Sequence, residues 1–218
     1  MYNKEEFDKI IKGTCPFDEL EAFVSDIHQK EFDTDNAFEK YYNIQIILSV
    51  IQRYENKEID DEYLSCWMHA YNWIIMAGFK TESENKEFSF HDWVEWEISN
   101  WLDGLTWFDD STDEFNIEEY KNSFIIINKI YENLNDWDCL LAHTDECGEL
   151  EDIVALLAIN YKAKEFVKMY GDLSYLDEDV EIEKMEFDEL KKKIEQLKLQ
   201  GFSELRYGFF CEKAGPNN

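Results

Sequence analysis

The chain has 218 residues, of which 44% are hydrophobic and 16% are aromatic, and its formal net charge is −29. This hydrophobic content is too high for a disordered acidic chain, so a folded protein is expected. The negative charge disfavours direct binding to nucleic acid, because contacts with phosphate need a basic surface. No apolar run approaches the roughly 18 residues that span a bilayer, so no membrane partner is expected.

The scarcity of turn residues indicates the fold class. With only 8 Gly and 2 Pro, long helices with short connections are favoured over a sandwich of many tight turns. We predict a mostly α fold, a single-domain bundle of about seven to eight helices over residues 1–218, with a short C-terminal β-strand. Five scattered cysteines indicate reduced thiols, and the first residues do not resemble a secretory leader, so a cytoplasmic location is expected.

In the first part of the chain, amphipathic segments predict helices over residues 5–12, 16–32, 37–58 and 61–79. Pro16 suits the first turn of the second helix, and Gly78 suits the end of the fourth. The apolar runs at 74–79 and 124–127 are expected to be buried core segments.

Capping signals predict two further helices, one beginning at Ser89 with Asp92 and one at Asn116 with Glu119. Another helix is predicted to reach Gly171, with its apolar residues spaced by four, namely Ile153, Leu157 and Tyr161. An acidic connector over 172–186 is the candidate hinge. A basic helix over 188–201 and a strand over 204–212 follow.

The negative charge is concentrated in the middle of the chain. Residues 81–160 carry 3 basic and 21 acidic side chains, a net charge of −18. Between Lys86 and Lys121 there are eleven carboxylates and no Lys or Arg. Such density repels itself, so it indicates either a device for solubility or a surface for a cationic partner.

A helix over residues 92–103 would place aromatic and acidic residues on opposite sides. The apolar face contains Val94, Ile98, Trp101 and Leu102, with Trp93 at its edge and Glu97 among them. A buried Glu97 would need a hydrogen-bond partner. The solvated face would carry Trp96 among Asp92, Glu95, Ser99 and Asp103.

An exposed tryptophan rimmed by carboxylates is suited to binding Arg or Lys side chains. The competing interpretation is that Trp96 packs under a neighbouring helix. The predicted partner-binding residues are Asp92, Glu95, Trp96, Asp103, Trp107, Asp109, Asp110, Asp113 and Glu114. The predicted function is an acidic protein inhibitor, in particular an immunity protein that neutralises a basic, nuclease-like toxin. The first alternative is a nucleic-acid mimic that acts against a defence protein.

Two enzymatic or metal-binding alternatives are weaker. Glu146, Glu149 and Asp152 resemble the acidic motif of all-α Mg²⁺-dependent nucleotide pyrophosphohydrolases, but the second Glu-x-x-Glu element of that family is absent upstream. Cys139, His143 and Cys147 have the spacing of three zinc ligands on a helix. No catalytic residue and no cofactor are predicted, so the chain is expected not to be an enzyme.

Overall fold

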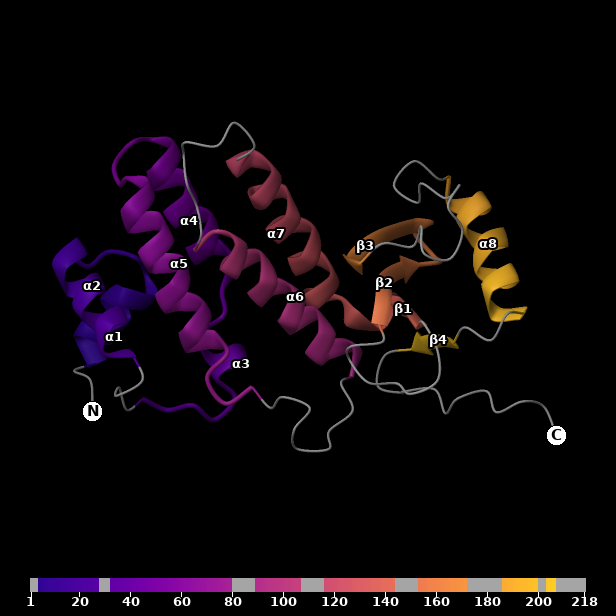
Figure 1. The fold of residues 1–218 in the computed structure, drawn as a ribbon, viewed down its shortest axis with the longest axis horizontal. Coiled ribbons are helices and arrows are strands. Elements are labelled where there is room, and N and C mark those ends of the chain that lie inside the picture. The colour runs from indigo at the N-terminus through magenta and orange to yellow at the C-terminus, as the bar shows by residue number, and fades with distance from the viewer. Residues whose placement is uncertain are drawn as a thin grey trace. The chain divides into compact units, whose positions relative to one another are not determined.

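The computed structural model describes residues 4–27, 32–79, 89–106, 116–143, 153–171, 186–199 and 203–206 (Figure 1). Over these ranges it contains eight α-helices and four strands, which confirms the mostly α fold. Contacts divide the chain into two compact units, one of Met1–Thr81 with Ile98–Asn128 and the other of Glu82–Glu97 with Lys129–Asn218. The sequence did not predict this division; the single domain stays a prediction, and residues 172–185 of the candidate hinge lie outside the described residues.

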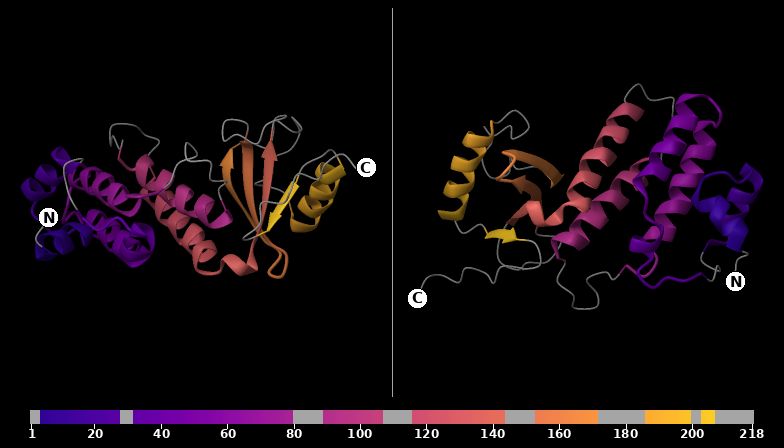
Figure 2. Two further views of the ribbon diagram at one scale, coloured as in Figure 1. Left: turned by 90° about the horizontal axis from the view of Figure 1, so that it is seen from below. Right: turned by 180° about the vertical axis from the view of Figure 1, so that it is seen from behind.

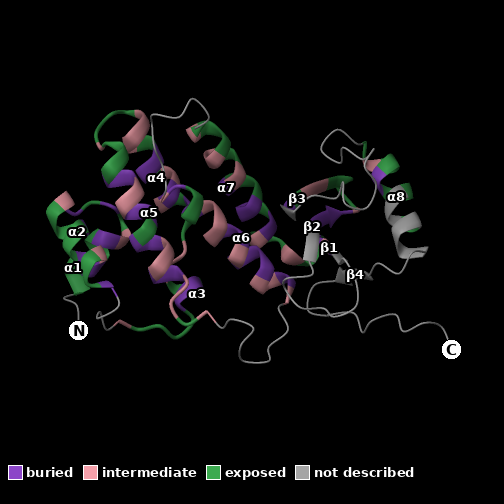
Figure 3. Cartoon of the chain, viewed as in Figure 1, coloured by how far each residue is buried: buried purple, intermediate pink, exposed green. Residues whose placement is uncertain are grey.

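The first unit is helical and is centred on α5 (Asp61–Ile75). This helix packs against four others: α1 (Lys4–Ile11), α2 (Phe17–Ser25), α3 (Ala37–Tyr41) and α4 (Ile44–Glu55). Trp67 and Tyr71 of α5 are fully buried and stack with ring centroids 4.7 Å apart. Figure 3 colours the helices of this unit by burial, and buried residues recur along α5. The α6 helix (Phe90–Gly104) contributes its residues from Ile98 onward, and α7 (Ile117–Glu132) its residues up to Asn128.

The single helix predicted over 37–58 is wrong, because the chain leaves helical geometry at Tyr42 and Asn43. The Asn43 side chain caps α4 by accepting a hydrogen bond from the Gln45 amide at 2.9 Å. The Tyr71 hydroxyl of α5 stabilises the break between the two helices. It accepts a hydrogen bond from the Asn43 amide and donates one to the Tyr41 carbonyl, both at 2.8 Å. A buried hydroxyl thus satisfies backbone groups that a continuous helix would have paired internally.

The second unit contains an antiparallel sheet of four strands in the order β3-β2-β1-β4 (Figure 2). The strands are β1 (Asp138–His143), β2 (Ile153–Asn160), β3 (Glu165–Gly171) and β4 (Ser203–Arg206). The predicted C-terminal strand is confirmed where it is described, and it pairs with β1. The predicted basic helix is confirmed as α8 (Phe187–Leu199), whose Phe187 ring lies 6.0 Å from that of Tyr161.

The helix predicted to end at Gly171 is wrong, since this segment forms the hairpin of β2 and β3. Leu157, Ala158 and Ile159 of β2 are consecutive and all buried, so both faces of this strand are covered and its sequence reads as a continuous apolar run without alternation. The hairpin turn contains no glycine. Instead, Asn160 Oδ1 accepts from the Ala163 amide at 2.8 Å and Lys164 adopts a φ of 57°. Among the described helices, none has the length and apolar character required to cross a membrane.

Candidate functional site

The start of α6 is fixed by a reciprocal cap, as its sequence predicted. The Ser89 amide donates to Asp92 Oδ2 at 2.7 Å, and the Asp92 amide donates to Ser89 Oγ at 3.2 Å. Asp92 is half-buried, and one of its carboxylate oxygens is engaged within its own helix. Its first role is therefore structural.

The apolar face of α6 is confirmed, whereas on its predicted solvated face only Asp103 is exposed among the five residues named for it. Val94, Ile98 and Leu102 are fully buried, and Glu97 is 6% exposed. All around the helix, every residue from 90 to 102 is buried or half-buried. Trp96 itself is half-buried. The role of Trp96 in partner binding stays a prediction, while Trp93 is buried and serves packing.

Glu95 is the clearest departure from the prediction, because it is only 7% exposed. Its Oε1 lies 3.4 Å from His91 Nε2 one turn earlier, and the His91 ring stacks on Tyr131 of α7 at 5.4 Å. A single helical period defines one buried face, whereas α6 has neighbours on further sides. Glu95 therefore does not belong to an exposed docking surface.

The C-terminal turn of α6 lies against the first turn of α7. The Trp101 and Tyr120 rings meet edge to face with centroids 5.3 Å apart, and a Cβ built on Gly104 would lie 3.1 Å from the Tyr120 hydroxyl. These two turns carry three exposed carboxylates, Asp103, Glu118 and Glu119, which we call the α6–α7 acidic end. Burial first, and then the charge of Glu119, raise the pKa of Tyr120.

Two lysines of the first unit are paired with carboxylates, and one of them lies beside this acidic end. Lys121 Nζ lies 3.1 Å from Glu55 Oε1 and 3.5 Å from Glu118 Oε2. The hydrogen bond from Lys121 to Glu55 raises the pKa of the lysine, so its ammonium stays charged and pairs with the two carboxylates. Lys40 is similarly paired with Asp33 at 2.7 Å. The negative excess is thus carried by the remaining exposed carboxylates.

Two exposed isoleucines on α7 were missed by the sequence analysis. Residues 124–127 were expected to be core, and Phe124 and Ile127 are indeed buried. Ile125 and Ile126 are instead 46% and 43% exposed. The signal that could have found them is the helical period itself, since Phe124, Ile127 and Ile130 define the buried face and leave the pair on the other side.

The remaining predicted partner-binding residues lie outside the described residues, namely Trp107, Asp109, Asp110, Asp113 and Glu114. The same holds for Glu146, Glu149, Asp152 and Cys147 of the enzyme and zinc alternatives. Cys139 and His143 lie on β1, so the helical spacing behind the zinc alternative is wrong. In the described part of the chain, no three His, Cys, Asp or Glu side chains are grouped to hold a metal ion.

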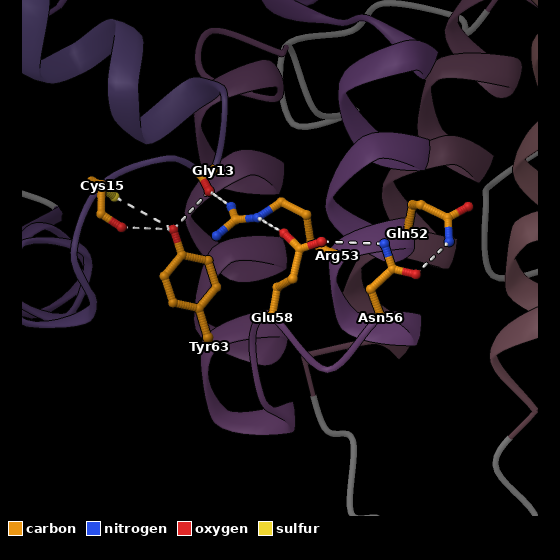
Figure 4. Close-up of polar contacts among 7 residues, drawn as sticks. All are labelled: Gly13, Cys15, Gln52, Arg53, Asn56, Glu58 and Tyr63. Carbon is orange, nitrogen blue, oxygen red and sulfur yellow. Dashed lines mark hydrogen bonds and ion pairs between the residues drawn. The ribbon is translucent and has the colours of Figure 1, made fainter.

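A buried polar cluster joins the end of α1 to α4 and α5 (Figure 4). The Tyr63 hydroxyl lies 2.9 Å from the carbonyl oxygens of Gly13 and Cys15, and Arg53 also donates to the Gly13 carbonyl. Arg53 Nε is 3.6 Å from Glu58 Oε2, so its charge is matched.

This cluster offers no reactive group. Burial raises the pKa of Tyr63 and of the Cys15 thiol, which keeps both protonated at neutral pH. The carbonyl oxygens of Gly13 and Cys15 already accept hydrogen bonds from within the chain. The cluster therefore anchors the turn after α1 and is a structural feature.

Comparison of the chain with protein-family models, with curated proteins and with solved structures gave no match.

Proposed function

We propose that the chain is an acidic protein inhibitor that binds and neutralises a basic, nuclease-like toxin in the manner of an immunity protein. The observation that carries the proposal is the stretch between Lys86 and Lys121, with eleven carboxylates and no Lys or Arg. Three of these carboxylates form the exposed α6–α7 acidic end, and they adjoin the acidic residues 109–114 along the chain. A cytoplasmic location would suit a protein that protects the cell producing it.

The proposed mechanism is electrostatic steering followed by short-range docking. A surface of one charge sign raises the rate of encounter with an oppositely charged partner by about 10- to 1,000-fold, and salt reduces the effect. Carboxylates that occupy the nucleic-acid cleft of a toxin would compete with its phosphate-bearing substrate. Specificity then comes from aromatic and aliphatic residues, among which Trp96 and Trp107 are the tryptophan candidates.

The test begins with capture of partners from a lysate of the source organism by the full chain, washed at low and then high salt. One basic protein that remains in stoichiometric amount after the high-salt wash is expected. Its association rate is then measured with the triple variant Asp103→Lys, Glu118→Lys and Glu119→Lys. We expect association to slow by about tenfold or more at low salt and by much less at high salt.

A matched control changes the same amount of charge elsewhere, at Glu5, Glu6 and Asp8 of α1, all of which are exposed. This control should slow association far less than the α6–α7 variant. Equal slowing by both variants would show a general polyanion effect and would contradict a specific acidic docking surface. An unchanged rate with both would contradict steering.

The nucleic-acid mimic remains a second candidate, because exposed carboxylates also gather away from α6. α2 carries Asp18, Glu19 and Glu21, and α5, against which it packs, begins with Asp61 and Glu62. A mimic would compete with DNA for several basic proteins, and these would all be released together as salt rises. An immunity protein would retain its one cognate toxin.

A further inference from the structure

The exposed isoleucine pair on α7 is unusual within this molecule. Among residues whose side chains the structure describes, Ile125 and Ile126 are the large hydrophobic residues that remain exposed. They are consecutive and lie about 100° apart around the helix axis, while Phe124 and Ile127 on either side are buried. Isolated exposed aliphatic residues are common on protein surfaces, whereas neighbouring ones beside charged residues can contribute to a binding surface.

The pair shares a helical face with part of the α6–α7 acidic end. At 100° per residue, Glu118 and Asn122 fall in angle between Ile125 and Ile126, and Glu119 lies close to Ile126. All five of these residues are exposed. Their order along α7 is therefore carboxylates in the first turn, an amide in the second and the two isoleucines in the third. The exposed Lys129 follows on the same helical face, and its charge is matched by Glu165 at 2.6 Å.

Charge decides what kind of molecule suits this face. A second copy of the chain would bring another net charge of −29 against exposed Glu118 and Glu119, and that repulsion opposes self-association. A partner with Lys or Arg beside an apolar cluster meets attraction at the carboxylates and burial at the isoleucines.

We propose that Ile125 and Ile126 are the apolar anchor of the docking surface, and that they receive a basic protein whose contact region sets an apolar cluster beside Lys or Arg side chains. This inference rests on the proposed function and specifies its partner. The carboxylates guide and orient the partner, and the isoleucines slow its release, because buried aliphatic contacts near the centre of an interface supply much of its affinity.

The test uses three synthetic amphipathic helical peptides as probes: one with a leucine face and a lysine face, one with the leucines replaced by serine, and one with the lysines replaced by glutamate. Each is titrated into the full chain, and binding is followed by fluorescence anisotropy at two salt concentrations. The Ile125→Gln, Ile126→Gln double variant is compared with wild type. Glutamine keeps the length and helix propensity of the position while removing its apolar character.

We expect the Leu/Lys peptide to bind wild type most tightly and to lose about tenfold or more of its affinity in the double variant. The Lys/Ser peptide should bind more weakly and equally to both proteins. Ala22→Gln, at an exposed position of α2, is the matched control and should leave all affinities unchanged. Circular dichroism of each variant verifies that the helices are retained.

The other outcomes separate this inference from the proposed function. Equal affinity of the Leu/Lys peptide for wild type and the double variant would overturn the anchor and leave the acidic inhibitor standing. Binding of the Leu/Glu peptide as tight as that of the Leu/Lys peptide would overturn the requirement for a basic partner. If no peptide binds while wild type self-associates and the double variant does not, the face belongs to a second copy and the inference is wrong. If no peptide binds and wild type stays monomeric, the anchor is also overturned.

Discussion

Ser99 of α6 donates a hydrogen bond to Asn72 Oδ1 of α5 at 2.8 Å, and this bond has a counterpart two turns away. There, Ser65 of α5 donates to the Thr106 carbonyl just beyond α6 at 2.6 Å. From the first bond to the second, the partner on α5 moves seven residues back, from Asn72 to Ser65, while the partner on the other segment moves seven residues forward, from Ser99 to Thr106. The two segments are therefore antiparallel here. These two hydrogen bonds help to set the register of the helix pair, because they are directional whereas apolar contacts are not.

Replacing Ser99 or Ser65 with alanine should therefore destabilise the fold. Each change removes one half-buried hydrogen bond, which contributes about 0.5–1.5 kcal/mol to the free energy of unfolding. Because the two sites are two turns apart and share no partner, the losses should add in the double variant. Urea unfolding measures them. Ser49→Ala, at an exposed position of α4, is the control and should change stability by less than about 0.5 kcal/mol.

Gly13→Ala should be more damaging than either serine variant. Gly13 has a φ of +60°, and a Cβ added there would lie 2.6 Å from Val50 Cγ2 and 3.1 Å from Trp67 Nε1. Left-handed backbone costs an alanine about 1–2 kcal/mol, and the contact with a packed core side chain adds to this. We expect a loss of about 2 kcal/mol or more in urea unfolding.

The control for this prediction is Ala22→Gly on the exposed face of α2, which reverses the substitution at a helical position. It should cost only about 1 kcal/mol, the ordinary penalty for glycine in a helix. If Gly13→Ala costs no more than that, the turn after α1 has room to relax and the anchoring role of the cluster in Figure 4 is overstated.

The sequence predicted those elements whose signals are local. The Ser89 and Asp92 cap and the basic helix α8 are confirmed because capping and helical periodicity depend on neighbours a few residues away. The β2–β3 hairpin was not predicted, since Asn160 and Lys164 form its turn without the glycine that usually marks one. Apolar runs rich in alanine and leucine also favour a helical interpretation until strand partners are known.

The site was harder to predict than the fold, because exposure depends on tertiary neighbours. Glu95 lies on the polar side of α6 by its period, yet it is buried. Ile125 and Ile126 belong to an apolar run, yet they are exposed. Both errors have one cause: a period shows which residues share a face, but the number of neighbouring helices determines how many faces are covered.

Cys66 should react slowly with alkylating reagents at neutral pH. Burial first, and then the charges of Glu21 and Glu62, raise the pKa of its thiol from 9.0 to about 11. At pH 8 its thiolate fraction is then about 100-fold below that of an unperturbed cysteine, and the thiolate is the reactive form. Iodoacetamide labelling across pH 7–10, read at this site by peptide mass spectrometry, should show the rate still rising at pH 10, where the rate of an unperturbed thiol levels off.

Glu21→Gln and Glu62→Gln test the electrostatic part of that shift. Each removes one negative charge near Cys66, so each should lower the thiol pKa and speed alkylation at pH 8. Glu5→Gln on α1 changes the net charge equally and should have a smaller effect, because Glu5 is absent from the charges that act on this thiol. Identical labelling rates for the three variants would leave burial as the sole cause.

The fold should lose stability above about pH 10, and Tyr71 should contribute to the loss. Burial raises the pKa of Tyr71 above its ordinary value of 10.0, so the folded state keeps the phenol protonated while the unfolded state releases the proton. The contribution of protonated Tyr71 to the free energy of unfolding is complete below the unfolded pKa and is lost as the pH rises through the folded pKa. Between the unfolded and the folded pKa, each such tyrosine lowers the free energy of unfolding by about 1.4 kcal/mol per pH unit.

Tyr71→Phe separates this titration from the hydrogen bonds of the same hydroxyl. The variant should be less stable than wild type at pH 7, because the Asn43 amide and the Tyr41 carbonyl lose their partner. Its unfolding free energy should then fall less steeply than that of wild type between pH 10 and 11.5, so the two curves converge. Parallel curves over that interval would show that Tyr71 does not titrate on unfolding, and the alkaline loss would then have to come from Tyr63 and the buried thiols, whose pKa values burial also raises.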